Sequence, residues 1–167
     1  MPEISIGLYP DVGASWFLSR MPGKLGLFLG LTGAHMNGRD ALDLNLADRF
    51  LLDEQQEALI EGLLQLNWQE QTPRQLNSLL KALQQEALEQ MPDAQWLPRR
   101  QQIDSWLDVS DVGCAWRAIS QLHNHSDALY SRAAKTLVEG CPLTAHLVWE
   151  QICLLYTSPS PRDLSTS

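Results

Sequence analysis

Two carboxylates near the start of the chain are the residues best suited to chemistry. Glu3 follows Pro2, and Asp11 follows Pro10. Two acids enclosed in this way can face one substrate. A carboxylate can act as a general base or as a nucleophile, so a pair can divide these tasks. We therefore treat Glu3 and Asp11 as the candidate catalytic residues.

Each acid also has an ordinary structural interpretation. Asp11 precedes Val12 and Gly13 and can simply cap a helix, because helix starts commonly use Asp. Glu3 can be a solvated residue of a strand. The residue types alone leave both interpretations open.

The elements that must position the two acids change type within a few residues. Ile4, Ile6 and Leu8 alternate with less apolar residues, which predicts a half-buried strand or extended segment. From Val12 the apolar spacing becomes helical, and Pro22-Gly23 divides that run into two helices. Four further signals follow: Gly33 as a helix stop, a helix over 38–44, Asn45 as its left-handed end and a strand over 48–52.

The remainder of the chain is predicted to be helical. A helix is expected from Asp53 to about Leu64, and Thr72-Pro73-Arg74-Gln75 has the form of a capping box that opens another. Further helices are expected over 100–107, 110–122 and 126–138 and from Pro142 onward. Gly26 and Gly30 stand four positions apart, a spacing that lets another backbone approach one helical face.

Composition excludes several classes of protein. The chain has 167 residues, of which 44% are hydrophobic and 19% charged, as is ordinary for a globular protein. Its longest apolar run, residues 25–31, is too short to span a membrane, and no signal peptide is readable. A net charge of -8 argues against nucleic-acid binding. Basic residues such as Arg20, Lys24 and Arg39 are too scattered to identify a binding site for an anion.

Other reactive residues fit structural roles better. The three cysteines Cys114, Cys141 and Cys153 lack disulfide or metal spacing, and a reducing compartment fits them. We assign no metal to the histidines, and Ser15 lacks a nucleophile elbow. The tryptophans are predicted to be core or interface anchors, with Trp16, close to Asp11, as the exception worth probing. The histidines and the other tryptophans considered are His35, His123, His125, His146, Trp116 and Trp149.

One continuous register of motifs resembles the second half of a crotonase-family protein, over about residues 1 to 150. Within this superfamily of acyl-coenzyme A enzymes, the opening run is most similar to the 3-hydroxyisobutyryl-CoA hydrolases. The motifs are Pro2-Glu3-x-x-Ile6-Gly7-Leu8-x-Pro10-Asp11-Val12-Gly13, Leu31-Thr32-Gly33, Gly38-Arg39-Asp40-Ala41-Leu42 and Leu46-Ala47-Asp48. Ala14-Ser15 departs from the glycines of many members.

The resemblance implies roles for both acids. Glu3 matches a position where hydrolases and enoyl-CoA hydratases keep a working glutamate, and in the hydrolases Asp11 completes the pair. Hydratases usually have glycine where Asp11 stands. The backbone N–H groups that bind the thioester oxygen come from earlier segments in the family, so the coenzyme A and oxyanion contacts are unassigned. We therefore expect the isolated chain to be inactive.

The expected fold class is an α/β crotonase-type fold fragment, mostly helical with one or two short strands. Residues 1–52 are predicted to be the C-terminal part of the crotonase core, and 53–152 a helical C-terminal region. Residues 153–167 are Ser/Pro-rich and resemble a translated sequencing adaptor, so we expect a non-native tail. Met1 matches an internal position of family members, which favours an internal fragment of a longer parent.

The parent is expected to hydrolyse 3-hydroxyisobutyryl-CoA, a valine-degradation step, with coenzyme A as part of the substrate and no cofactor. An enoyl-CoA hydratase or isomerase is the nearest rival, and a non-catalytic helical interaction module is the rival from another class. We expect an acyl-CoA small molecule as partner, no nucleic acid and no membrane, and a homo-oligomer is one possible assembly. The location follows the organism: bacterial cytoplasm or mitochondrial matrix.

Overall fold

The chain is organised as two compact units. The computed structural model describes residues 3–68 and 72–157, and over these residues the regular structure is entirely helical. The first unit combines Met1–His35 with Trp96–Ser167, and the second unit is Met36–Gln95. The N-terminal segment that carries both candidate acids thus belongs with the C-terminal helices.

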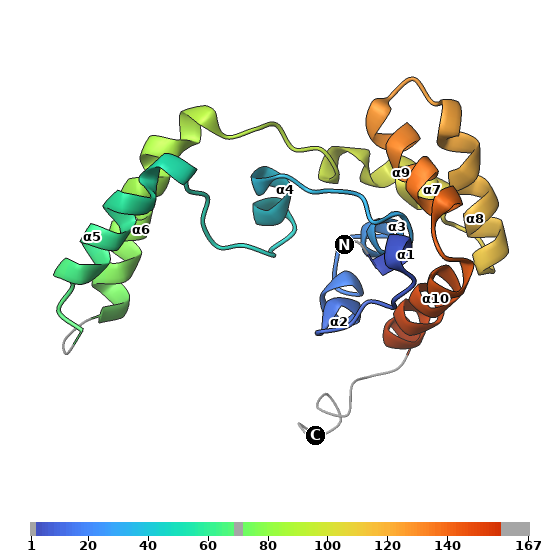
Figure 1. Cartoon of the computed structure of the whole chain (residues 1–167), viewed down its shortest axis with the longest axis horizontal. Helices are drawn as coiled ribbons and strands as arrows, with labels where there is room; N and C mark the ends of the chain where they lie inside the picture. Colours follow the sequence, from blue (N-terminus) through green and yellow to red (C-terminus); the bar gives the residue numbers. More distant parts are fainter. Residues whose placement is uncertain (1–2, 69–71, 158–167) are drawn as a thin grey trace. The chain divides into compact units, whose positions relative to one another are not determined.

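Helix α3 (Leu25–Thr32) is the centre of the first unit. All eight of its residues are buried. A helix that is apolar on every side is stable only when neighbours cover it completely. Helices α1 (Glu3–Ile6), α2 (Ala14–Leu18), α7 (Arg100–Trp106), α9 (Ala128–Glu139) and α10 (Pro142–Thr157) supply that cover, and Figure 1 shows them around α3.

Two glycines let neighbouring helices approach α3 closely. A Cβ at Gly26 would overlap the carbonyl oxygen of Leu18, the last residue of α2. A Cβ at Gly30 would lie 2.9 Å from Cγ1 of Val148 on α10. The predicted packing role of both glycines is therefore confirmed. Gly26 packs against the backbone of α2, and Gly30 packs against a side chain of α10.

Aromatic side chains fill the other side of the first unit. Trp96, just before the 3₁₀ helix η3 (Leu97–Arg99), packs on Phe28 with ring centroids 5.5 Å apart. Its indole Nε1 donates to the carbonyl oxygen of His35 at 2.8 Å. Tyr130 on α9 packs on Trp106 at 4.8 Å. Helix α8 (Val112–Ser120) and the 3₁₀ helix η4 (Gln121–Asn124) then pack against α9.

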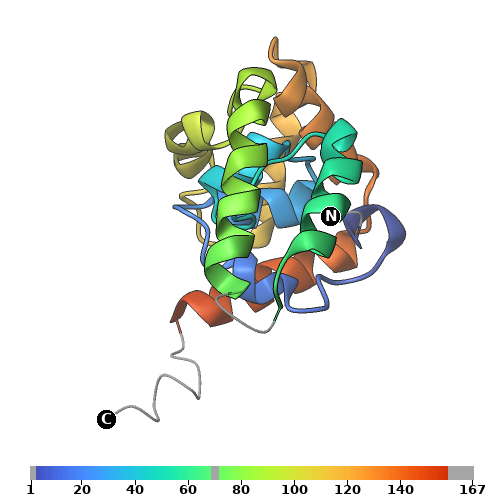
Figure 2. The same cartoon turned by 90° about the vertical axis from the view of Figure 1, so that its left-hand side faces the viewer.

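The second unit is built around a helical pair. Helices α5 (Gln56–Gln65) and α6 (Thr72–Ala87) pack side by side, as Figures 1 and 2 show, with 3₁₀ helices η1 (Asp53–Gln55) and η2 (Leu88–Gln90) beside them. Before them, α4 (Gly38–Asp43) begins with a capping box between Asn37 and Asp40. Asp40 is fully buried and also accepts a hydrogen bond from the Gln95 backbone N–H at 2.7 Å.

Most predicted helices and stops are confirmed. Gly33 ends α3 with φ +61°, and Asn45 has φ +57° just after α4. The helices after Asp53 start and end within a few residues of the expected positions. Asp53 itself makes no capping hydrogen bond, since Leu52 stands at the cap and Gln55 bonds back to it at 3.0 Å.

Neither of the two predicted strands forms within the described residues. Residues 3–6 form α1, because the chain closes a local bond from the Leu8 N–H to the Glu3 carbonyl oxygen at 3.1 Å. Residues 49–52 have no regular structure. A strand requires a pairing partner for its backbone groups, and neither segment has one in the part of the chain that the structure describes.

The predicted division at residue 52 separates the part of the chain that matches the family core from the helical region after it. It is not based on which residues pack together, so it stays a prediction. At the other predicted boundary, α10 continues through Thr157, so the helical pattern does not break at Cys153. Residues 158–167 of the predicted tail lie outside the described residues. Among the described helices, none combines the length and apolar character needed to cross a bilayer.

Gly26→Ala is expected to destabilise the chain far more than Gly30→Ala. The first Cβ meets a backbone carbonyl, which can move only with α2, whereas the second meets a side-chain methyl that can rotate. We expect losses of roughly 3 kcal/mol or more for Gly26→Ala and about 1 kcal/mol for Gly30→Ala. Urea denaturation followed by circular dichroism measures both, and equal losses would contradict the proposed close approach.

Asp127→Asn is expected to lower stability at neutral pH but not in acid. Burial opposes ionisation, but hydrogen bonds from Arg99 at 2.6 Å and from the Leu129 N–H hold the pKa of Asp127 below its ordinary 3.8. A lowered folded-state pKa adds stability that is complete above pH 3.8 and is lost as the pH falls through the folded value. Asn keeps the helix cap, so the variant isolates the charge.

Unfolding free energies at pH 7 and pH 3 measure this effect. The difference in unfolding free energy between wild type and Asp127→Asn should be smaller at pH 3 than at pH 7. The control is Glu139→Gln on the same helix, whose ion pair with Lys135 spans 3.8 Å between exposed side chains and should matter little at either pH. A difference that does not change with pH would exclude the ionic contribution.

Candidate functional site

Glu3 opens α1 with one carboxylate oxygen in an unusual state. Its Oε2 is buried and has no hydrogen-bond partner among the described residues. The next residue, Ile4, is 1% exposed and anchors α1 in the core. A buried carboxylate oxygen without a partner costs free energy, and such groups in folded proteins call for an explanation, of which a catalytic role is one. The interpretation of Glu3 as a solvated strand residue is therefore wrong.

Asp11 stands at the start of a tight turn on the surface. Its carbonyl oxygen accepts the Ala14 N–H at 2.7 Å, and Val12 and Gly13 follow with φ of +46° and +82°. The helix cap of α2 is Gly13, and it makes no side-chain capping bond. The interpretation of Asp11 as a helix cap is therefore wrong, and its carboxylate is exposed.

Val12 makes this turn strained. A β-branched residue with positive φ is a true outlier, and Val12 is also 98% exposed, so no packing compensates it. Strain of this kind persists where surrounding structure holds it, and it gathers at functional sites. The turn is tight despite Ala14-Ser15, because Val12 and Gly13 together make the reversal.

Helices α1 and α2 rest on the same support. Both pack against α3 and α10, and Figure 1 shows the four helices together. The backbone N–H of Cys141, just before α10, also donates to the Ile4 carbonyl oxygen at 2.8 Å. The two carboxylates are not hydrogen-bonded to each other. Helices α3 and α10 therefore support the segments that carry both acids. The pairing of the two acids in catalysis stays a prediction.

Trp16 on α2 and Arg20, two residues after its end, contact each other on the surface. Trp16 is 58% exposed, and the guanidinium carbon of Arg20 lies 3.9 Å from its ring centroid. Arg20 also donates to the Trp16 carbonyl oxygen at 3.0 Å. Trp16, which the sequence sets apart from the other tryptophans, is thus on the surface with a cation on its ring.

The histidines and cysteines that the sequence offered as reactive residues have structural or surface roles. His125 accepts the Asp127 N–H at 3.0 Å and packs on Tyr130, while His123 is exposed. Three or more His, Cys, Asp or Glu residues grouped as metal ligands do not occur over residues 3–68 and 72–157. Within the described residues, the three cysteines form no disulfide.

The sequence did not single out one cavity of the first unit. Trp116, also predicted to be a core or interface anchor, is 38% exposed and lines this pocket together with Arg117 and His146. These residues come from α8 and α10, which are far apart in the chain. No local motif joins them, so only the fold brings them together.

Comparison with known proteins gives a consistent result. Residues 1–161 match the family described as Enoyl-CoA hydratase/isomerase. The chain is 31% identical over 152 residues to the mitochondrial 3-hydroxyisobutyryl-CoA hydrolase of Danio rerio, covering 91% of this chain and 39% of that protein. It is 50% identical over 66 residues to the Homo sapiens protein of that name, covering 40% of this chain and 17% of that protein. The chain therefore spans well under half the length of these relatives.

Solved structures agree with the sequence matches. A carnitinyl-CoA dehydratase from Mycobacterium thermoresistibile superposes with a TM-score of 0.76 at 27% identity, over 98% of this chain and 44% of that one. An enoyl-CoA hydratase from Rhodobacter sphaeroides 2.4.1 superposes with a TM-score of 0.63 at 30% identity, over 98% of this chain and 42% of that one. The resemblance and the crotonase-type fold class read from the motifs are confirmed. The chain belongs to the enoyl-CoA hydratase/isomerase family.

Proposed function

We propose that the full-length parent of this chain is an acyl-CoA thioester hydrolase, acting on 3-hydroxyisobutyryl-CoA or a close short-chain hydroxyacyl-CoA. The similarity to relatives that carry this name supports the choice. The observation that carries it in the structure is the buried, unpartnered Oε2 of Glu3. No donor among the described residues uses the lone pairs of this oxygen.

Hydrolysis of a thioester needs three contributions. The carbonyl must be polarised, a nucleophile must reach it, and the thiolate must leave. In the proposed mechanism Glu3 attacks the carbonyl carbon or takes a proton from the water that does so. Asp11, exposed on its turn, orients the substrate hydroxyl or assists proton transfer. The carbon–sulfur bond breaks, and one water is consumed to give a free acid and the coenzyme A thiol.

The isolated chain is proposed to be inactive. The N–H groups that stabilise the developing oxyanion belong, by the family resemblance, to segments outside these residues. Loss of a single such donor costs on the order of 10² to 10³ in rate. Coenzyme A enters as part of the substrate, and carboxylate chemistry of this type needs no further cofactor. The zebrafish and human relatives are named as mitochondrial proteins, and we place the parent in the mitochondrial matrix if it is eukaryotic and in the cytoplasm if it is bacterial.

A hydratase or isomerase of the same family is the second candidate. The two solved structures that superpose over nearly the whole chain are named as a dehydratase and a hydratase. These reactions add or remove water or shift a double bond, and they release no thiol. Thiol release by the parent therefore separates the two candidates, and Asp11 is the residue that favours the hydrolase.

In the full-length parent, Glu3→Gln is expected to reduce thiol release from 3-hydroxyisobutyryl-CoA by at least roughly 10²-fold, because the amide is neither base nor nucleophile. Asp11→Asn should cause a smaller loss. A thiol-reactive dye measures both rates. Arg132→Gln on the outer face of α9 is the control and should keep the wild-type rate. Wild-type rates for Glu3→Gln and Asp11→Asn would refute the mechanism.

In the isolated chain, the same Glu3→Gln change is expected to increase stability. It removes a charge whose Oε2 is buried without a partner, which should raise the unfolding free energy by about 1 kcal/mol. Asp11→Asn is exposed and should stay within about 0.5 kcal/mol of wild type. Chemical denaturation of the three proteins measures this. A large loss for Glu3→Gln would mean that the carboxylate is structurally satisfied.

A further inference from the structure

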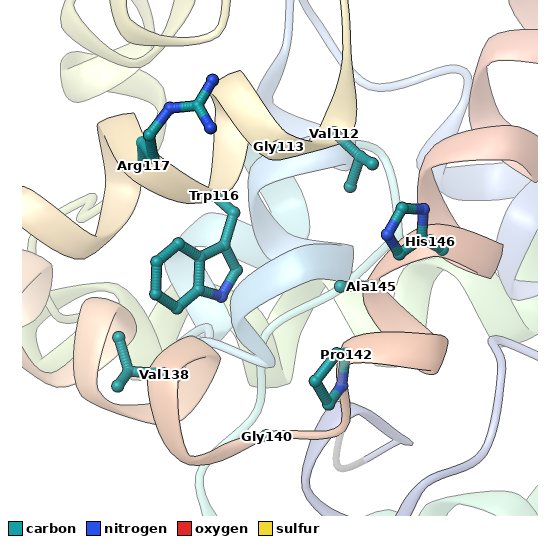
Figure 3. A pocket seen from close by; sticks show the side chains of 9 residues that line it. All are labelled: Val112, Gly113, Trp116, Arg117, Val138, Gly140, Pro142, Ala145 and His146. Carbon is teal, nitrogen blue, oxygen red and sulfur yellow. The ribbon is translucent and has the colours of Figure 1, made fainter.

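A pocket of about 440 Å³ lies in the first unit, between α8, the end of α9 and the start of α10. This volume is within the range of small-molecule sites, roughly 300 to 1,000 Å³. Figure 3 shows its apolar walls, which come from Val112, Val138, Pro142 and Ala145. Neither Glu3 nor Asp11 lines it, so it is separate from the candidate catalytic residues.

Two hydrogen-bond donors, Trp116 and His146, face this apolar pocket, and Arg117 lines it from α8 with its guanidinium turned away from the opening, as Figure 3 shows. In Figure 3 the indole nitrogen of Trp116 is on the ring edge that faces Pro142 and Ala145, and His146 stands across the opening. Within the described residues, neither of these side chains makes a hydrogen bond. Arg117 donates only to Sγ of Cys114, at 3.0 Å, which leaves most of its N–H groups available.

The charges beside the pocket are a cation, Arg117, and an anion, Asp111. Asp111 is the N-cap residue of α8, and its carboxylate accepts the Cys114 backbone N–H at 2.8 Å. That bond and the one from the Cys114 thiol lower the pKa of Asp111, so it is ionised and offsets part of the Arg117 charge. A ligand anion therefore needs the indole N–H and His146 as well as Arg117.

We propose that this pocket binds an apolar carboxylate, such as a medium-chain aliphatic acid. The chain would fill the space between Val112, Val138 and Pro142. The carboxylate would accept hydrogen bonds from Trp116 and His146, with Arg117 as the neighbouring cation. Apolar walls with a few convergent donors are the usual composition of such sites, since the walls supply affinity and the donors fix orientation. This proposal does not depend on the thioester hydrolase activity.

The first experiment compares three probes on the 167-residue chain. Decanoate carries chain and charge, decanol carries the chain alone, and propanoate carries the charge alone. We expect decanoate to bind at least about tenfold more tightly than either of the others, which corresponds to roughly 1.4 kcal/mol. Calorimetric titration gives the affinities. Equal binding of decanol would show that charge is not recognised, and equal binding of propanoate would show that the pocket is not filled; either result overturns the proposal.

The position of the probe is read from the indole ¹⁵N–¹H signals, and Trp116→Phe identifies the signal of Trp116. Decanoate should shift this signal most among the six tryptophans. A larger shift elsewhere, including at Trp16, would place the acid outside the pocket and refute the site.

Variants test the individual groups. Trp116→Phe, Arg117→Gln and His146→Gln should each weaken decanoate binding by roughly three- to tenfold, since each removes one contact to a charged group. Val138→Glu should abolish binding by placing a carboxylate on the wall. Val138 is 44% exposed, so the chain should still fold, which circular dichroism checks. Arg132→Gln removes the same charge from α9 away from the pocket and should bind normally. Unchanged affinity in all four pocket variants would overturn the assignment.

Discussion

The close approach between α3 and the end of α2 is the contact on which the first unit depends. A helix buried on every side must be covered by its neighbours at short distance, and the hydrogen atom of Gly26 is the only side chain that fits against the Leu18 carbonyl oxygen. Leu18 ends the helix whose start follows the Asp11 turn. Gly26 therefore allows α2, which follows the Asp11 turn, to pack closely against the core. Gly30 allows α10, which also supports α1, to pack closely against α3.

The carboxylates of Asp40 and Glu3 differ in how their oxygens are hydrogen-bonded. Asp40 in the second unit is fully buried, and its oxygens accept bonds from the Asn37 and Gln95 N–H groups at 3.1 and 2.7 Å. Glu3 has a buried oxygen that accepts none. Proteins satisfy polar groups that have a structural purpose, and they leave unfavourable features where function requires them. The strained Val12 beside Asp11 is a second such feature in the same segment.

The sequence predicted what local rules determine. Pro22-Gly23 separated α2 from α3, and Gly33 and Asn45 adopted the left-handed backbone expected of them. The alternation of Ile4 and Ile6 predicted a strand, but a period of two forms a strand only where a partner strand exists. Ile4 is 1% exposed and Ile6 is 60% exposed in the helix that forms instead. The motif located Glu3 and Asp11, but the unpartnered state of Glu3 and the pocket beside Trp116 arise from packing between distant segments, which no local pattern encodes.

The hydrogen bond from Cys141 to Ile4 also bears on how the protein is made. A ribosome releases the chain from its N-terminus, so α1 emerges long before the residue that will hold it. Helices α5 and α6 are neighbours in the chain, so their contact can form soon after both have been synthesised. In the first unit, by contrast, α3 is covered fully only after α10 has been synthesised, so its apolar surface stays exposed for longer.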